Sequence, residues 1–134
     1  MDTKSPPRIS AVTPPPKGQK NAVAHVWGAF LYSMAGFRFL MEQRAARLQF
    51  GMALIAVVIF LLSGVSLFHW VIMGALLLTG LCVEALNTAI ELIVDRTSPE
   101  ISDYAMHAKD LGSFAVFCTM VVFWGHVGWA VFLA

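Results

Sequence analysis

Five polar residues between positions 84 and 95 interrupt an otherwise apolar part of the chain. At about 100° per residue, a helix places all five within an arc of roughly 100° on one face: Glu84, Asn87, Thr88, Glu91 and Asp95. Carboxylates inside a membrane helix are costly unless something compensates them, so they indicate a functional site. Carboxylate and amide oxygens are hard ligands of the kind that magnesium prefers, usually together with substrate phosphates. The stripe is therefore typical of a magnesium site.

A structural interpretation of the same residues also stays open. Asn87 and Thr88 could serve only to hydrogen-bond neighbouring helices. Asp95, which Arg96 follows, could simply mark the end of the helix at the membrane boundary. Glu84 and Glu91 are two acids in heptad spacing, and for them function is the favoured interpretation.

A second group of polar residues precedes the last apolar stretch. Lys109 and Asp110 could be ordinary boundary charges, which is the interpretation that composition alone favours. Lys109 could also neutralise a phosphate as a point charge. Gly112 and Ser113 are small enough to let two helices approach closely.

The composition favours a membrane protein over a water-soluble enzyme. Of 134 residues, 58% are hydrophobic and 13% are charged, which is about half the charged share of a soluble domain. The net charge of +1 argues against a nucleic-acid partner. Cys82 and Cys118 lie in separate apolar runs and indicate neither a disulfide framework nor a zinc site.

The distribution of charges predicts three membrane spans. Residues 48–83 contain no Asp, Glu, Lys or Arg, and this stretch is too long for one helix of about 20 residues. A turn around Gly64 to Trp70 would divide it, and residues 111–134 form another stretch without formal charge. We therefore expect spans over residues 50–68, 70–94 and 111–134, with a loop over residues 95–110.

The residues before the first span divide into two parts. Residues 1–20 hold five of the six prolines and lack the apolar core of a signal peptide, so we expect a flexible tail. Residues 21–49 mix aromatic and basic residues, which predicts a helix at the membrane surface that could kink at Gly28 or Gly36. A soluble helix packed on other protein stays an alternative. The predicted fold is an all-α integral membrane domain over residues 21–134, with one amphipathic surface helix and three transmembrane helices.

The basic residues predict the orientation of these spans. Seven Lys and Arg residues lie at or before Arg47, and the loop over residues 95–110 adds Arg96 and Lys109. The turn between the first two spans has none. Positive residues favour the cytoplasmic side, so we expect the N-terminus and that loop in the cytoplasm and the C-terminus outside.

The motif Glu84-x-x-Asn87-Thr-Ala-Ile-Glu91-x-x-x-Asp95-Arg96, followed by Ala108-Lys109-Asp110-x-Gly-Ser, resembles the small prokaryotic diacylglycerol kinase family. That family also contains the undecaprenol kinases, and the resemblance covers about residues 25–134. It implies phosphorylation of a membrane lipid hydroxyl with ATP and Mg²⁺ at the bacterial inner membrane. It also implies a homotrimer with active sites shared between chains. The acceptor would be diacylglycerol, giving phosphatidic acid, with undecaprenol as the alternative.

The resemblance implies a role for each matching residue. Glu84 would be the catalytic base for the lipid hydroxyl, Asn87 would lie beside the transferred phosphate, and Glu91 would bind magnesium. The resemblance assigns ATP-binding positions to a further group of residues: Tyr32, Asp95, Glu100, Ser102, Lys109 and Asp110.

One position departs from the family's pattern. The family carries a second metal-binding glutamate on the surface helix, and alignment without gaps puts Gln43 or Arg44 there. Glu42 is the only acid in this region, so we expect Glu42 to be the second metal ligand. A shift of one residue rotates a helical side chain by about 100°, so the choice among these three neighbours stays open.

Two other functional classes stay open as well. An ion- or proton-conducting membrane subunit could use Glu84 and Glu91 as relay carboxylates, although Asn87, Lys109 and Asp110 would then have no role. An inactive scaffold could be a kinase that has lost its second metal ligand. The chain has no glycine-rich phosphate loop of the Walker type, so it does not resemble the soluble kinases.

Overall fold

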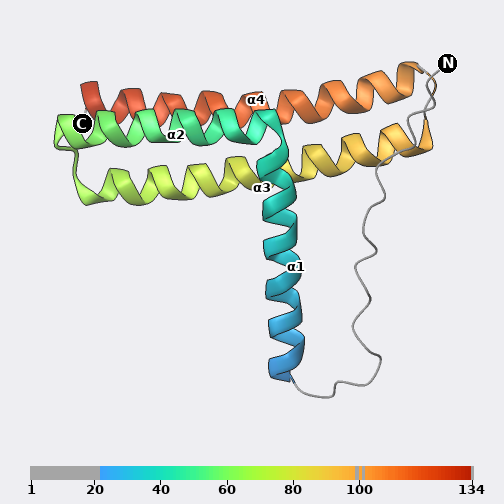
Figure 1. Ribbon diagram of the computed structural model, residues 1–134. Coiled ribbons are helices and arrows are strands. Elements are labelled where there is room, and N and C mark those ends of the chain that lie inside the picture. Colours follow the sequence, from blue (N-terminus) through green and yellow to red (C-terminus); the bar gives the residue numbers. More distant parts are fainter. Residues whose placement is uncertain (1–21, 99, 101, 134) are drawn as a thin grey trace. The chain divides into compact units, whose positions relative to one another are not determined.

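The computed structural model describes residues 22–98, 100 and 102–133. Every regular element in these residues is a helix: α1 (Ala22–Glu42), α2 (Arg44–Ser63), α3 (Leu67–Thr97) and α4 (Asp103–Phe132). The predicted all-α fold with one N-terminal helix and three long apolar helices is confirmed (Figure 1). The tail predicted over residues 1–20 lies outside the described residues. The described residues form two compact units that divide after Phe37.

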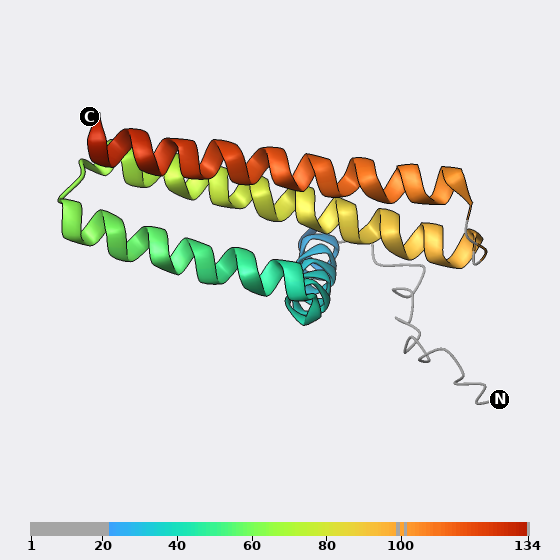
Figure 2. The ribbon, with the colours of Figure 1, turned by 90° about the horizontal axis from the view of Figure 1, so that it is seen from above.

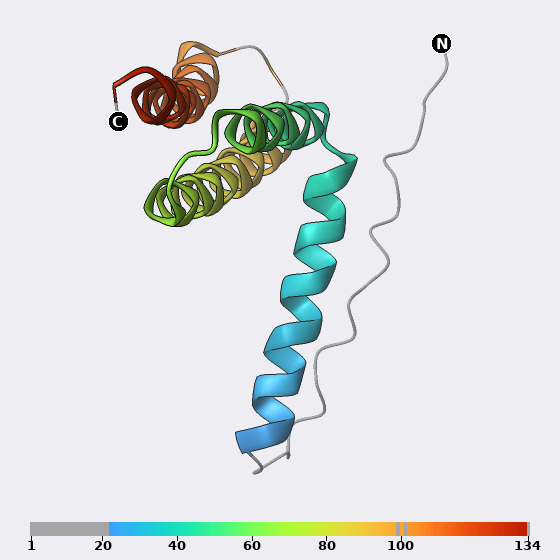
Figure 3. The ribbon, with the colours of Figure 1, turned by 90° about the vertical axis from the view of Figure 1, so that its left-hand side faces the viewer.

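The helices α2, α3 and α4 pack side by side with alternating directions, so α2 and α4 run the same way (Figure 2). Seen end-on, they form a three-sided bundle rather than a flat layer (Figure 3). α3 and α4 have 31 and 30 residues against 20 in α2. At 1.5 Å per residue they are about 15 Å longer than α2. They therefore extend past the first residue of α2, at the end where α3 joins α4.

All three helices of this bundle are long and apolar enough to cross a membrane. Their ends differ from the predicted spans, because a helix can continue past the apolar segment that defines a span. The turn between α2 and α3 is also shorter than predicted, so His69 and Trp70 lie inside α3. Gly64 ends α2 with φ 64°, and its N–H donates to the Phe60 carbonyl oxygen at 3.1 Å. Glycine is favoured there because a Cβ is strained in that conformation.

The helix predicted over residues 21–49 is divided at Gln43. Gln43 has extended backbone angles of φ −75° and ψ 136°, and it precedes α2 without a side-chain capping bond. Gly28 and Gly36 do not interrupt α1. The break has no local sequence signal because no glycine or proline lies near it. It comes three residues before Ala46, where the buried face of α2 begins.

The buried residues of α2 form one narrow face with spacings of three and four: Ala46, Gln49, Ala53, Ala56 and Phe60. Such spacing places side chains on one side of a helix. The three alanines are small residues of the kind that let membrane helices approach closely. Gln49 is the only polar residue in this set, which makes it a candidate for a specific contact.

The apolar core lies near the end of the bundle where α2 turns into α3. Its buried members come from all three helices: Ala56, Phe60, Met73, Phe123, Val127 and Ala130. The ring of Trp70 packs edge-on against Phe60 at 5.3 Å. His126 Nε2 lies 3.1 Å from the His69 carbonyl oxygen, which links α4 to α3 in the same region. Apolar side chains and the contact between His126 and His69 therefore hold the three helices together at this end of the bundle.

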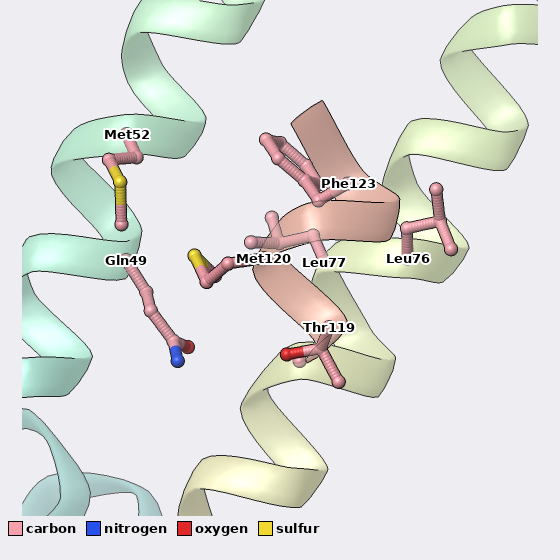
Figure 4. A pocket seen from close by; sticks show the side chains of 8 residues that line it. Gln49, Met52, Leu76, Leu77, Thr119, Met120 and Phe123 are labelled. Carbon is pink, nitrogen blue, oxygen red and sulfur yellow. The ribbon is translucent and has the colours of Figure 1, made fainter. Parts of the chain in front are cut away.

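A thin, nearly filled gap separates this core from the polar stripe of α3. Its volume is about 10 Å³, enough for about one water molecule. Figure 4 shows Gln49 reaching from α2 toward α3 and α4 beside this gap. The residues around it are Gln49, Met52, Leu76, Leu77, Gly80, Thr119, Met120 and Phe123.

Candidate active site

The polar stripe of α3 faces the interior of the bundle. Glu84 is 2% exposed, and Asn87 and Thr88 are also buried. Glu91, one turn further along, is half-buried, and Asp95 is exposed. The residues on the other side of α3 are exposed, as the helical periodicity predicts: Ala85, Ala89, Leu92 and Ile93.

Gln49 of α2 holds the carboxylate of Glu84. Its Nε2 donates to Glu84 Oε2 at 3.2 Å, and both side chains are buried. Hydrogen bonds to a carboxylate are among the stronger ones in proteins, so this bond fixes the orientation of Glu84. Sequence reasoning missed Gln49, although one signal existed. It is a long polar side chain at the start of the charge-free stretch over residues 48–83.

Asn87 organises the next turn of the stripe. Its Nδ2 donates to Glu91 Oε1 at 3.0 Å, which orients that carboxylate. Its Oδ1 is buried without a hydrogen-bond partner. A Cβ added at Gly112 of α4 would lie 2.0 Å from this oxygen. A larger residue at position 112 would therefore force the Asn87 side chain to move.

We expect Gly112→Ala to destabilise the bundle, because the new methyl group must displace Asn87. Overpacking of this kind costs about 1–3 kcal/mol. The measurement is thermal unfolding in detergent micelles, followed by circular dichroism. Gly125→Ala is the matched control, since nothing lies within 4 Å of a Cβ at that position of α4. Equal melting temperatures for the two variants would contradict the close packing of Gly112 on Asn87.

An open pocket of about 410 Å³ lies beside these residues, where α2 begins. Two carboxylates, two amides and a guanidinium line it together. The full lining is Gln43, Arg44, Ala45, Glu84, Asn87, Thr88, Glu91, Ser113 and Val116. Three residues that sequence analysis placed at the reaction centre, Glu84, Asn87 and Glu91, thus share one pocket.

The expected second metal ligand does not line this pocket. Glu42 is exposed at the last residue of α1, and its two successors, Gln43 and Arg44, line the pocket instead. The sequence could not show which of these three neighbours lines the pocket. The helix break at Gln43 changes the directions of the side chains on its two sides from those in one continuous helix.

The donors in the pocket fit one magnesium ion bound together with a phosphate ligand. Glu91 offers a carboxylate and Asn87 offers a buried amide oxygen without a partner. Among the described residues, no group of three or more His, Cys, Asp or Glu side chains could hold a metal ion by itself. Magnesium typically takes one or two protein carboxylates and completes its shell with phosphate oxygens and water.

A second polar cluster joins α3 to α4 beyond the pocket. Lys109 of α4 forms an ion pair with Asp95, one turn after Glu91. Ser102 caps α4 by accepting a hydrogen bond from the Ala105 N–H at 3.2 Å. α3 ends at Thr97 and α4 begins at Asp103, so both helices extend into the range 95–110 that was predicted as a loop.

The remaining candidate residues are exposed and less constrained. Glu100 lies in the link, where its carbonyl oxygen is 3.5 Å from Ser98 Oγ. Asp110 lies in the first half of α4, and Tyr32 lies on α1. Within the described part of the chain, neither Glu100 nor Asp110 forms an ion pair.

Comparisons with known proteins agree on one family. Residues 31–132 match the family described as prokaryotic diacylglycerol kinase. A Sinorhizobium protein named diacylglycerol kinase is 40% identical over 90% of this chain and 88% of its own length. Proteins of the same name from Pseudomonas aeruginosa and Escherichia coli are 34% and 36% identical, over 91% and 72% of this chain and 98% and 87% of their own lengths. The chain therefore belongs to the prokaryotic diacylglycerol kinase family and is a membrane lipid kinase.

Proposed function

We propose that this lipid kinase transfers the γ-phosphoryl group of ATP to the hydroxyl of diacylglycerol, with magnesium, to form phosphatidic acid. The observation that carries the proposal is the buried Glu84 carboxylate, which Gln49 holds and which lines the open pocket where α2 begins. The names of the relatives support diacylglycerol as the acceptor. The reaction would take place at the cytoplasmic face of the bacterial inner membrane.

Glu84 would act as the general base. It accepts the proton of the lipid hydroxyl while the hydroxyl oxygen bonds to the γ-phosphorus and the bridging bond to the β-phosphate breaks, releasing ADP. Gln49 keeps one carboxylate oxygen in place through its hydrogen bond. No other hydrogen bond to Glu84 forms within the described residues, so the second oxygen is available to the acceptor. A base inside an apolar bundle suits a hydroxyl that stays attached to two acyl chains.

Glu91 and Asn87 would hold the magnesium ion. When bound, the ion would neutralise negative charge on the transferred phosphate. Enzymes catalyse phosphoryl transfer mainly by positioning the reactants and neutralising this charge, rather than by forming covalent bonds to the phosphate. Asn87 also holds the Glu91 carboxylate in one orientation, so the ligand is preorganised before the ion arrives.

The nucleotide would extend from this pocket along the protruding ends of α3 and α4. Asp95 and Lys109 form an ion pair one turn beyond Glu91, in the direction that leads away from Glu84. We assign nucleotide contacts to the residues that the family resemblance implies: Tyr32, Asp95, Glu100, Ser102, Lys109 and Asp110. We further propose that the domain over residues 21–134 forms a homotrimer with a cytoplasmic N-terminus.

A panel of lipid acceptors tests this function. The full-length protein is assayed in mixed micelles with labelled ATP, magnesium and either diacylglycerol or undecaprenol. We expect the label to enter diacylglycerol at least about tenfold faster than undecaprenol. A tenfold ratio of rates corresponds to a difference of about 1.4 kcal/mol in activation free energy. Faster labelling of undecaprenol would reassign the acceptor. No labelled lipid from either acceptor, with proton flux into protein-containing vesicles without ATP, would favour the conducting subunit.

A further inference from the structure

Arg44 is the only cationic side chain among the residues that line the pocket. Two carboxylates, Glu84 and Glu91, line the same pocket, yet Arg44 forms no ion pair with either. The one ion pair within the described residues joins Lys109 to Asp95. The guanidinium of Arg44 therefore has up to five N–H donors available to a ligand.

The position of Arg44 in its helix is unfavourable for the helix itself. It is the first residue of α2, and the first turn of α2 contains no acidic residue. A cation at a helix N-terminus opposes the helix dipole, whereas an anion there is favoured. The capping residue Gln43 makes no side-chain bond to the free N–H groups of the first turn. The guanidinium and the helix terminus thus create positive potential at the same edge of the pocket.

The reaction places one phosphate in this pocket. The lipid hydroxyl must reach the carboxylate of Glu84, and the γ-phosphorus must bond to that hydroxyl oxygen. The γ-phosphate therefore occupies the space that Glu84 and Arg44 both line. It carries negative charge into a pocket that already holds two carboxylates, so a fixed cation beside it is needed.

We propose that Arg44 binds the terminal phosphate of the nucleoside triphosphate. This proposal rests on the proposed function, because it requires a triphosphate in this pocket. A planar guanidinium can donate two parallel hydrogen bonds to phosphate oxygens, and it keeps its charge at every physiological pH. Arg44 supplies a centre of positive charge on the α2 side of the phosphate, and Glu91 with its magnesium ion supplies another on the α3 side.

Nucleotide binding to the full-length protein in detergent micelles tests the proposal. A nonhydrolysable ATP analogue with an imido β–γ bridge is compared with ADP, both at saturating magnesium. We expect Arg44→Gln to weaken binding of the analogue by about tenfold or more, as for loss of a charge-assisted hydrogen bond. ADP binding should change by less than about twofold, because ADP lacks the terminal phosphate. Arg44→Lys keeps the positive charge but lacks the planar guanidinium. Its affinity for the analogue should lie between those of wild type and Arg44→Gln.

Arg47→Gln is the matched control. Arg47 lies three residues further along α2, is exposed and does not line the pocket. We expect it to leave the affinities for both nucleotides unchanged. Equal affinity of wild type and Arg44→Gln for the analogue would overturn the proposal, as would equal weakening of the analogue and ADP. If Arg44→Gln fails to fold, Arg44→Lys is used instead. The proposal then requires that Arg44→Lys weakens binding of the analogue more than binding of ADP. A folded wild type that binds neither nucleotide would refute the kinase function itself.

Discussion

Glu84→Gln should abolish nearly all lipid phosphorylation while the protein stays folded. The amide has the shape of the carboxylate but cannot accept the proton of the lipid hydroxyl. Loss of a positioned general base lowers kcat by about 10²- to 10⁴-fold. An amide oxygen at position 84 can still accept the hydrogen bond from Gln49 Nε2, so the packing of α2 on α3 is preserved.

The measurement for this variant is the rate of phosphate transfer to diacylglycerol under saturating ATP, lipid and magnesium. Asp103→Asn is the matched control, because it makes the same chemical change at an exposed position in the first turn of α4, outside the pocket. We expect the control to keep wild-type kcat. A Glu84→Gln protein with more than half of the wild-type kcat would remove Glu84 from the chemistry.

Glu91→Gln should raise the magnesium concentration needed for half-maximal activity by about tenfold or more. The change replaces an anionic ligand with a neutral amide oxygen, which is a weaker ligand for a hard divalent cation. The hydrogen bond from Asn87 can persist, because an amide oxygen also accepts from Nδ2. The lost affinity should therefore come from the missing charge rather than from a misplaced side chain.

A magnesium titration of initial rates measures this effect. Glu84→Gln is a second comparison, measured through its residual rate. It should lower kcat but change the magnesium requirement less than Glu91→Gln does. Asp103→Asn again controls for loss of one negative charge on the protein. An unchanged titration midpoint in Glu91→Gln would show that magnesium binds elsewhere.

The sequence predicts the fold and the α3 side of the pocket because both depend on local patterns. Long charge-free stretches predict the three apolar helices, and the spacing of Glu84, Asn87 and Glu91 places them on one helix face. Glu84 and Asn87 are buried and Glu91 is half-buried, because this face of α3 packs toward the other helices of the bundle. The requirement for a small residue at Gly112 follows from the same close packing.

The α2 side of the pocket could not be predicted, because it depends on contacts between distant parts of the chain. Gln49 and Glu84 are 35 residues apart, and only the packing of α2 on α3 brings them together. The helix break at Gln43 has no glycine or proline to signal it. That break decides that Arg44, rather than Glu42, lines the pocket.

The most direct test is single-turnover transfer of labelled phosphate from ATP to diacylglycerol by the purified full-length protein in mixed micelles. The structure predicts labelled phosphatidic acid that requires magnesium and is nearly absent with Glu84→Gln. Folded wild-type protein that yields no labelled lipid, or labelling that persists in Glu84→Gln at the wild-type rate, would contradict a kinase centre at this pocket.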